Sequence, residues 1–154
     1  MLDLKRRAVL ADTVGNNLYG LAVGGTLDYL AGLDAEGIAV SRFSGAIVNT
    51  ISGAPYGWWR EKAFQITGTK ESSGKIRQTL VDLLAFNTFQ TPLYALLVGI
   101  GSKFSEGDIN WDKMGQGASY LALISPFIGP TMGWFMDGVR KVFRAKSAAE
   151  GNYF

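Results

Sequence analysis

The sequence has no cysteine and no histidine among its 154 residues. The absence of cysteine excludes disulfide bonds and thiolate chemistry, and the absence of histidine means that any proton carrier must be a carboxylate. No nucleophile-base pair, metal-ligand spacing or phosphate-binding loop is visible. We therefore predict that the chain is not an enzyme and uses no cofactor or metal.

Charge is also missing over long stretches, although 18% of the residues are charged and the mean hydropathy is only +0.11. Four windows carry no charged residue: 13–27, 43–59, 83–102 and 114–136. A transmembrane helix needs about 20 mostly apolar residues. The last two windows are long enough by themselves, and the first two are long enough when their flanking residues are included. The 20 glycines suit membrane helices, which tolerate glycine and use it for close packing, better than soluble helix interiors.

These windows predict an all-α membrane protein, a single transmembrane domain over residues 1–154, rather than a soluble helical protein with buried apolar helices. The expected helices cover about 8–31, 41–60, 76–101 and 114–137. Lysine and arginine are concentrated at the two termini and in the connection after the second helix, which together hold 12 of the 15. By the positive-inside rule, both termini are cytoplasmic.

A weak internal repeat accompanies this orientation. Pro55-x-Gly57-Trp58 near the end of the second helix is similar to Pro130-x-x-Gly133-Trp134 near the end of the fourth. The repeat indicates two parallel helical hairpins. We expect no nucleic-acid partner, because the basic residues flank the predicted helices and suit anionic membrane lipid.

Polar residues form stripes along three of the expected helices. One stripe follows Asp82 and consists of Asn87, Gln90, Thr91 and Tyr94, at the i, i+3, i+4 and i+7 spacing of one helix face. A second consists of Asp12, Asn16 and Gly20, and a third of Arg42, Asn49 and Tyr56. Lipid offers no hydrogen bonds, so such faces must pack against other helices or line a wet cavity.

The stripes supply the candidate site residues. Asp82 and Asp12 are the candidate proton carriers, although an ion pair with Arg77 or Lys75 at the cytoplasmic surface explains Asp82 equally well. The candidate contacts for a bound ligand are Arg42, Asn49, Asn87, Gln90, Tyr94 and Asn16. Glycine pairs at i, i+4 let helices approach closely. We expect Gly20 with Gly24 and Gly53 with Gly57 to contact a second subunit of a homo-oligomer, the alternative being packing within one chain.

The chain resembles the small bacterial inner-membrane L-alanine exporter family. The resemblance rests on residues in matching order: Ala11-Asp12-Thr13, Asp28, Ser41-Arg42, Asn49, Pro55-Tyr56-Gly57 with Arg60, Asp82, Phe89-Gln90-Thr91-Pro92-Leu93-Tyr94, and Gly133 with Asp137, Arg140 and Phe143. It implies a four-helix protein of the bacterial plasma membrane that exports L-alanine, driven by the proton gradient. The alternative is a structural or accessory membrane protein whose polar faces serve only packing. The tail 149–154 resembles a protease-site linker, and we expect no function from it.

Overall fold

The computed structural model describes residues 3–26, 35–106 and 108–153. Its helices are α1 (Leu4–Tyr19), the π-helical segment η1 (Gly20–Gly24) that continues α1, α3 (Ala35–Ile66), α4 (Lys75–Glu106) and α5 (Trp111–Val142). These residues contain no strand. The expected all-α fold with four helices is therefore confirmed.

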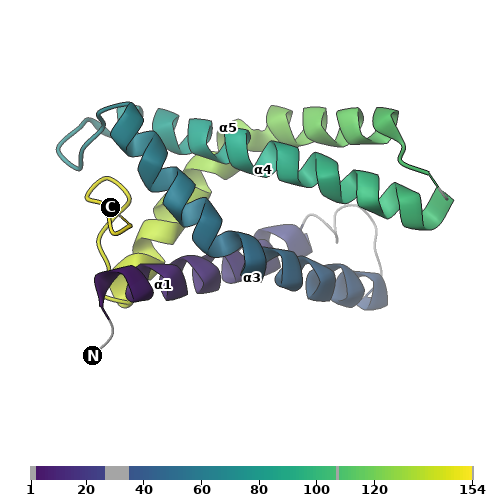
Figure 1. Ribbon diagram of the computed structural model, residues 1–154, viewed down its shortest axis with the longest axis horizontal. Coiled ribbons are helices and arrows are strands. Elements are labelled where there is room, and N and C mark those ends of the chain that lie inside the picture. The colour runs from purple at the N-terminus through teal and green to yellow at the C-terminus, as the bar shows by residue number, and fades with distance from the viewer. Residues whose placement is uncertain (1–2, 27–34, 107, 154) are drawn as a thin grey trace.

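The helices are arranged as two hairpins that meet at one end (Figure 1). α1 packs along α3, and α4 packs along α5. Between the hairpins, α1 contacts α5 and α3 contacts α4. Gly15 of α1 faces Met136 and Val139 of α5, while Phe64 of α3 belongs to the same buried cluster as Val81 of α4. The C-terminal parts of α3 and α5 are thus shared by both hairpins.

α3 runs six residues beyond its expected end at Arg60. Pro55, which the sequence places near the end of this helix, lies inside it. The helix continues because Arg60 and Glu61 are completely buried and find ionic partners there, so this point is interior rather than interface. The end comes at Gly68, whose φ of 60° allows the N–H of Thr69 to bond the carbonyl of Phe64 at 2.9 Å.

α5 ends in a turn of the same kind, but with an arginine at the left-handed position. Arg144 has φ 55°, and the N–H of Ala145 bonds the carbonyl of Arg140 at 2.9 Å. A non-glycine residue in this conformation costs roughly 1–2 kcal/mol. The turn reverses the chain, so that residues 145–153 run back beside the C-terminal part of α5 instead of extending away from it (Figure 1).

The remaining helix ends also differ from the expected ones. α1 begins at Leu4, four residues early, because the Asp3 carboxylate caps it by accepting a bond from the N–H of Arg6 at 2.7 Å. Its expected end at 31 and Asp28 lie outside the described residues. α4 and α5 are each longer than expected at both ends. Over the described residues, none of the helices combines the length and apolar character that crossing a membrane requires.

The apolar core is small and divided. One buried cluster joins α3 to α4 and the tail: Ala63, Phe64, Val81, Ala85 and Ala148. The other lies between α3, α4 and α5: Tyr56, Phe86, Met132 and Met136. The most deeply buried large side chains include charged ones, since Arg60, Glu61 and Arg140 are each 0% exposed. The centre of this fold is therefore polar.

Candidate functional site

Each hairpin buries one aspartate against a glycine of its partner helix. In the first hairpin, the carboxylate of Asp12 on α1 lies where a Cβ on Gly57 of α3 would stand. In the second, the carboxylate of Asp82 on α4 lies in the same way against Gly133 of α5. Only glycine leaves room for a carboxylate at these two points, which explains why Gly57 and Gly133 occupy equivalent places in the two halves.

Arg60 of α3 neutralises carboxylates of the other hairpin. Its Nε donates to Asp82 Oδ1 at 2.6 Å. Its two terminal nitrogens donate to the two oxygens of Asp137, at 2.8 and 2.7 Å, as a bidentate pair. The guanidinium also lies over the ring of Phe64, 5.6 Å from the centroid. Arg60 thus connects α3 to both α4 and α5.

Arg140 of α5 neutralises carboxylates of the first hairpin in the same way. Its Nε and NH2 donate to the two oxygens of Asp12, both at 2.7 Å. Its NH1 donates to Glu61 Oε1 at 2.9 Å, and its NH2 also reaches the carbonyl of Gly57 at 3.3 Å. Each arginine therefore pairs with two carboxylates of the hairpin to which it does not belong. These four ion pairs hold the four helices together.

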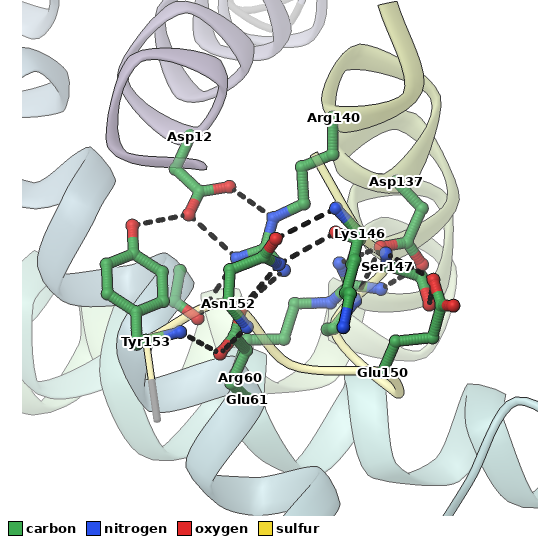
Figure 2. A network of polar contacts seen from close by, with 12 residues as sticks. Asp12, Arg60, Glu61, Asp137, Arg140, Lys146, Ser147, Glu150, Asn152 and Tyr153 are labelled. Carbon is green, nitrogen blue, oxygen red and sulfur yellow. Dashed lines mark hydrogen bonds and ion pairs between the residues drawn. The ribbon is translucent and has the colours of Figure 1, made fainter. Parts of the chain in front are cut away.

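The C-terminal tail completes this charged cluster from outside the helices (Figure 2). The backbone N–H groups of Asn152 and Tyr153 donate to Glu61 Oε2 at 2.7 and 2.8 Å. The side-chain amide of Asn152 donates to Glu61 Oε1 at 2.9 Å. Together with Arg140, these groups give Glu61 four hydrogen-bond donors, of which the tail supplies three.

Two further contacts hold the tail to aspartates. The N–H of Ala148 donates to Asp137 Oδ1 at 3.1 Å. The hydroxyl of Tyr153 donates to Asp12 Oδ2 at 2.7 Å. Burial, with the negative charge of Asp12 next in importance, raises the pKa of the Tyr153 hydroxyl above its ordinary value, so the group stays protonated and keeps its donor role. The tail is therefore bound to the charged cluster through Glu61, Asp12 and Asp137.

The cluster holds more negative than positive charge. Among the described residues, its ion pairs join four carboxylates, those of Asp12, Glu61, Asp82 and Asp137, to two guanidinium groups. A buried charge without a compensating partner is costly, and such a carboxylate gains stability from binding a proton or a cation. The arrangement is thus suited to taking up positive charge, and metal-binding groups of three or more acidic, cysteine or histidine residues are absent from the described chain.

The expected proton carriers lie in this cluster, whereas the expected substrate contacts lie farther along the hairpins. Asn16 is 2% exposed and donates to the carbonyl of Asn49 at 2.9 Å and to Ser52 Oγ at 3.1 Å. Asn87 makes the corresponding contact in the second hairpin, donating to Ser125 Oγ at 2.7 Å. These amides lie along the contact between the two helices of each hairpin, beginning about one turn beyond the aspartates. We call this contact the polar seam of the hairpin.

The other expected contacts are more peripheral. Arg42 NH1 donates to the carbonyl of Gly20 at 2.7 Å, at the opposite end of the first hairpin from the charged cluster. Gln90 is half-buried, and Tyr94 is 45% exposed. The structure therefore does not bring Arg42, Gln90 and Tyr94 together with the aspartates. Asp82 pairs with Arg60 rather than with Arg77 or Lys75, because Arg77 instead bonds Thr69 at 3.0 Å in the connection.

The glycine pairs have a different use from the expected subunit contact. Gly53 and Gly57 are buried against α1, where a Cβ on Gly53 would stand 2.7 Å from the Cα of Thr13. Gly20 lies against the side chain of Asn49. Gly24 ends η1, and its surroundings are outside the described part of the chain. Gly20, Gly53 and Gly57 therefore pack the chain's own helices, the alternative to a subunit contact.

The sequence pattern did not identify six residues of the cluster: Arg60, Glu61, Asp137, Arg140, Asn152 and Tyr153. Three of these carried the family resemblance, but none was assigned a role. A signal was available in the repeat, because Gly57 precedes Glu61 and Gly133 precedes Asp137 by the same four residues. The basic residues were interpreted as flanking the helices beside anionic lipid, and this interpretation concealed that Arg60 and Arg140 are buried.

Comparisons with known proteins agree on one family. The family model described as L-alanine exporter matches residues 2–146. The L-alanine exporter AlaE of Citrobacter koseri is 29% identical over 143 residues, covering 92% of this chain and 91% of its own length. That of Cronobacter sakazakii is 28% identical over 144 residues, covering 93% and 87%, and that of Escherichia coli is 29% identical over 140 residues, covering 90% and 89%. No solved structure matches this chain. On the family match over residues 2–146, this chain belongs to the L-alanine exporter family.

Proposed function

We propose that this protein exports L-alanine, or a similar small neutral amino acid, across the bacterial plasma membrane as a proton-driven secondary transporter. The observation that carries the proposal is the buried cluster in which four carboxylates face two guanidinium groups at the junction of two hairpins. A secondary transporter needs a buried group that can gain and lose a proton, placed where two halves move against each other. The identity of the substrate is inferred from the family and from the names of the relatives.

Membrane insertion as four spans, with both termini cytoplasmic, is part of the same proposal. Its support is the outer surface of the helices, where large apolar side chains are exposed. Examples are Phe43 at 72%, Leu123 at 73% and Phe127 at 78%. Charged residues of the same helices, such as Arg60 of α3 and Arg140 of α5, are buried. An apolar exterior around a polar centre is the arrangement that lipid favours, because lipid cannot satisfy polar groups.

Of the two candidate proton carriers, Asp82 is the better placed. Asp12 accepts three donors, two from Arg140 and one from Tyr153. Asp82 accepts one, from Arg60, among the described residues. Fewer hydrogen bonds therefore hold the Asp82 carboxylate, and it separates from its partner with the loss of a single bond. Proton uptake at Asp82 would weaken its pair with Arg60 and so loosen the contact between α3 and α4.

The polar seams of the two hairpins are the proposed path of the substrate. Asn16 and Asn87 occupy corresponding places one turn or so from the aspartates, with Asn49 beside the first. Amide groups at such positions can bond both the carboxylate and the ammonium of a zwitterion. Arg42 lies at the other end of the first hairpin, and Gln90 and Tyr94 lie on α4. These three residues are proposed to contact the substrate along its route, not to form one common pocket.

Homo-oligomerisation also stays a proposal. Since Gly20, Gly53 and Gly57 pack within the chain, a second subunit would contact the outward faces of the helices instead. Cross-linking in native membranes tests this, because a protein found only as a monomer would exclude it.

The decisive experiment is expression in a bacterium that lacks its own alanine exporters and is supplied with an alanine-containing dipeptide. We expect lower intracellular alanine, more alanine in the medium and growth at dipeptide concentrations that stop the parent strain. A protonophore should abolish the difference, and Asp82→Asn serves as the matched inactive variant. Unchanged alanine levels with the protein present in the membrane would favour a structural or accessory role.

A further inference from the structure

The C-terminal tail offers Glu61 the same groups that an amino acid would offer. Three N–H donors of residues 152 and 153 reach this one carboxylate, at 2.7, 2.8 and 2.9 Å. A primary ammonium group also presents three N–H donors, and it adds a positive charge. The N–H groups of the tail therefore occupy the hydrogen-bonding positions at Glu61 that an ammonium group would occupy.

Removing the tail would leave a site rather than a closed surface. Glu61 Oε2 receives all its hydrogen bonds from the tail, so among the described residues it would lose every donor. Asp12 would lose the Tyr153 hydroxyl. In a cluster with two carboxylates in excess, the exposed oxygens would attract a cation.

A second observation points to a ligand in the same region. The hydroxyl of Tyr56 is completely buried and is the one buried side-chain polar atom, within the described chain, that has no hydrogen-bond partner. Tyr56 lies one helical turn before Arg60 on α3, and its side chain packs in the buried cluster with Phe86, Met132 and Met136. Native proteins seldom leave such a donor unsatisfied. An O–H donor without an acceptor, one turn from an arginine of the charged cluster, suits a ligand that has a carboxylate as well as an ammonium group.

We propose that Glu61 and Asp12 bind the ammonium group of the transported amino acid, and that residues 147–153 occupy this site as a plug when no substrate is bound. The inference rests on the proposed function, since it takes the substrate to be a small amino acid. Substrate and tail then compete, and the measured affinity is reduced by the fraction of protein whose tail is docked.

The plug can be followed directly because the chain has no cysteine of its own. Ala148 is 2% exposed in the docked tail, so Ala148→Cys reports tail release by its rate of reaction with a maleimide. Met136→Cys is the control, since Met136 is 1% exposed where α5 packs against Gly15 of α1 and reacts faster only if the helices separate. The purified protein is labelled with L-alanine, ethylamine, propionate or no addition.

We expect L-alanine and ethylamine to speed labelling of Ala148→Cys at least about threefold, and propionate and the Met136→Cys control to show no change. Equal rates with and without ethylamine would overturn the ammonium site. Acceleration by propionate alone would also overturn it, because a carboxylate would then be the displacing group.

Transport kinetics give a second, independent test. Asn152→Ala combined with Tyr153→Phe removes the two side-chain donors of the tail, and truncation after Lys146 removes the tail itself. Both should lower the half-saturating alanine concentration severalfold, whereas Glu61→Gln in the truncated chain should raise it about tenfold. If the tail only stabilises the fold, truncation will instead lower export per folded molecule. The proposal that the tail acts as a plug would then be wrong. If the unmodified chain exports no alanine, the proposed function fails while the labelling result still stands for the ammonium site.

Discussion

Arg140 binds both carboxylate oxygens of Asp12, a residue 128 positions earlier in the chain, through Nε and NH2 at 2.7 Å each. Both side chains are completely buried. Because the pair connects the last helix to the first, it closes the bundle. Arg60 with Asp82 makes the corresponding connection between the two middle helices at 2.6 Å.

Breaking the first pair should therefore be costly. We expect Arg140→Gln to lower the free energy of unfolding in detergent by about 3–5 kcal/mol, because it leaves buried carboxylates without their cation. Asp12→Asn should cost less in combination with Arg140→Gln than the sum of the two single changes. Chemical denaturation of the four forms of this cycle gives the coupling, and strictly additive effects would show that the pair does not hold the bundle together.

The two aspartate–glycine contacts predict a specific sensitivity to a single methyl group. Gly57→Ala and Gly133→Ala should each destabilise the protein by about 1–3 kcal/mol, because the added Cβ overlaps a buried carboxylate. Gly138→Ala is the matched control on α5, where nothing lies within 4 Å of the added atom. That change should raise stability by about 0.5–1 kcal/mol, since alanine favours a helix over glycine. Thermal unfolding of the three variants tests the contact, and equal shifts would contradict it.

Asp82→Asn should abolish export while the protein stays in the membrane. The amide keeps the size of the side chain but can no longer exchange a proton, and the bond to Arg60 Nε can be retained by the amide oxygen. Export of labelled alanine, normalised to the membrane content of the protein, gives the result. Activity that persists and keeps its sensitivity to a protonophore would transfer the proton-carrier role to Asp12.

Arg42→Ala should also abolish export, for a reason separate from the charged cluster. Arg42 bonds the carbonyl of Gly20 at the far end of the first hairpin, where it can receive the substrate's carboxylate. Arg42→Lys keeps the charge and should retain part of the activity. If Arg42→Ala transports normally, the residue serves only to hold η1 against α3.

The topology can be tested with single cysteines at positions 70 and 108, both of which are exposed. With cytoplasmic termini, a membrane-impermeant maleimide added to intact cells should label Asp108→Cys but not Lys70→Cys. Permeabilised cells should label both, which controls for reactivity. Labelling at position 70 in intact cells would reverse the proposed orientation.

Local features of the sequence were enough to give the four helices. Helix formation depends on the spacing of apolar and polar residues within a few turns, so uncharged windows such as 83–102 located α4 and α5 to within a few residues at most ends. The same periodicity identified Asp12 and Asp82 as inward-facing. Helix ends were less accurate, because α3 continues past Arg60 only on account of partners that lie elsewhere in the chain.

Only the tertiary structure decided which charges meet. Arg140 could have been a surface anchor after the last helix or the partner of an aspartate, and its own neighbours in sequence are the same in both cases. The choice depends on how the hairpins cross, which sets the distance between α1 and α5 and cannot be obtained from spacing along one helix. The same holds for Asn152 and Tyr153, since a short polar tail has no periodicity and gains its structure from the carboxylates that it covers.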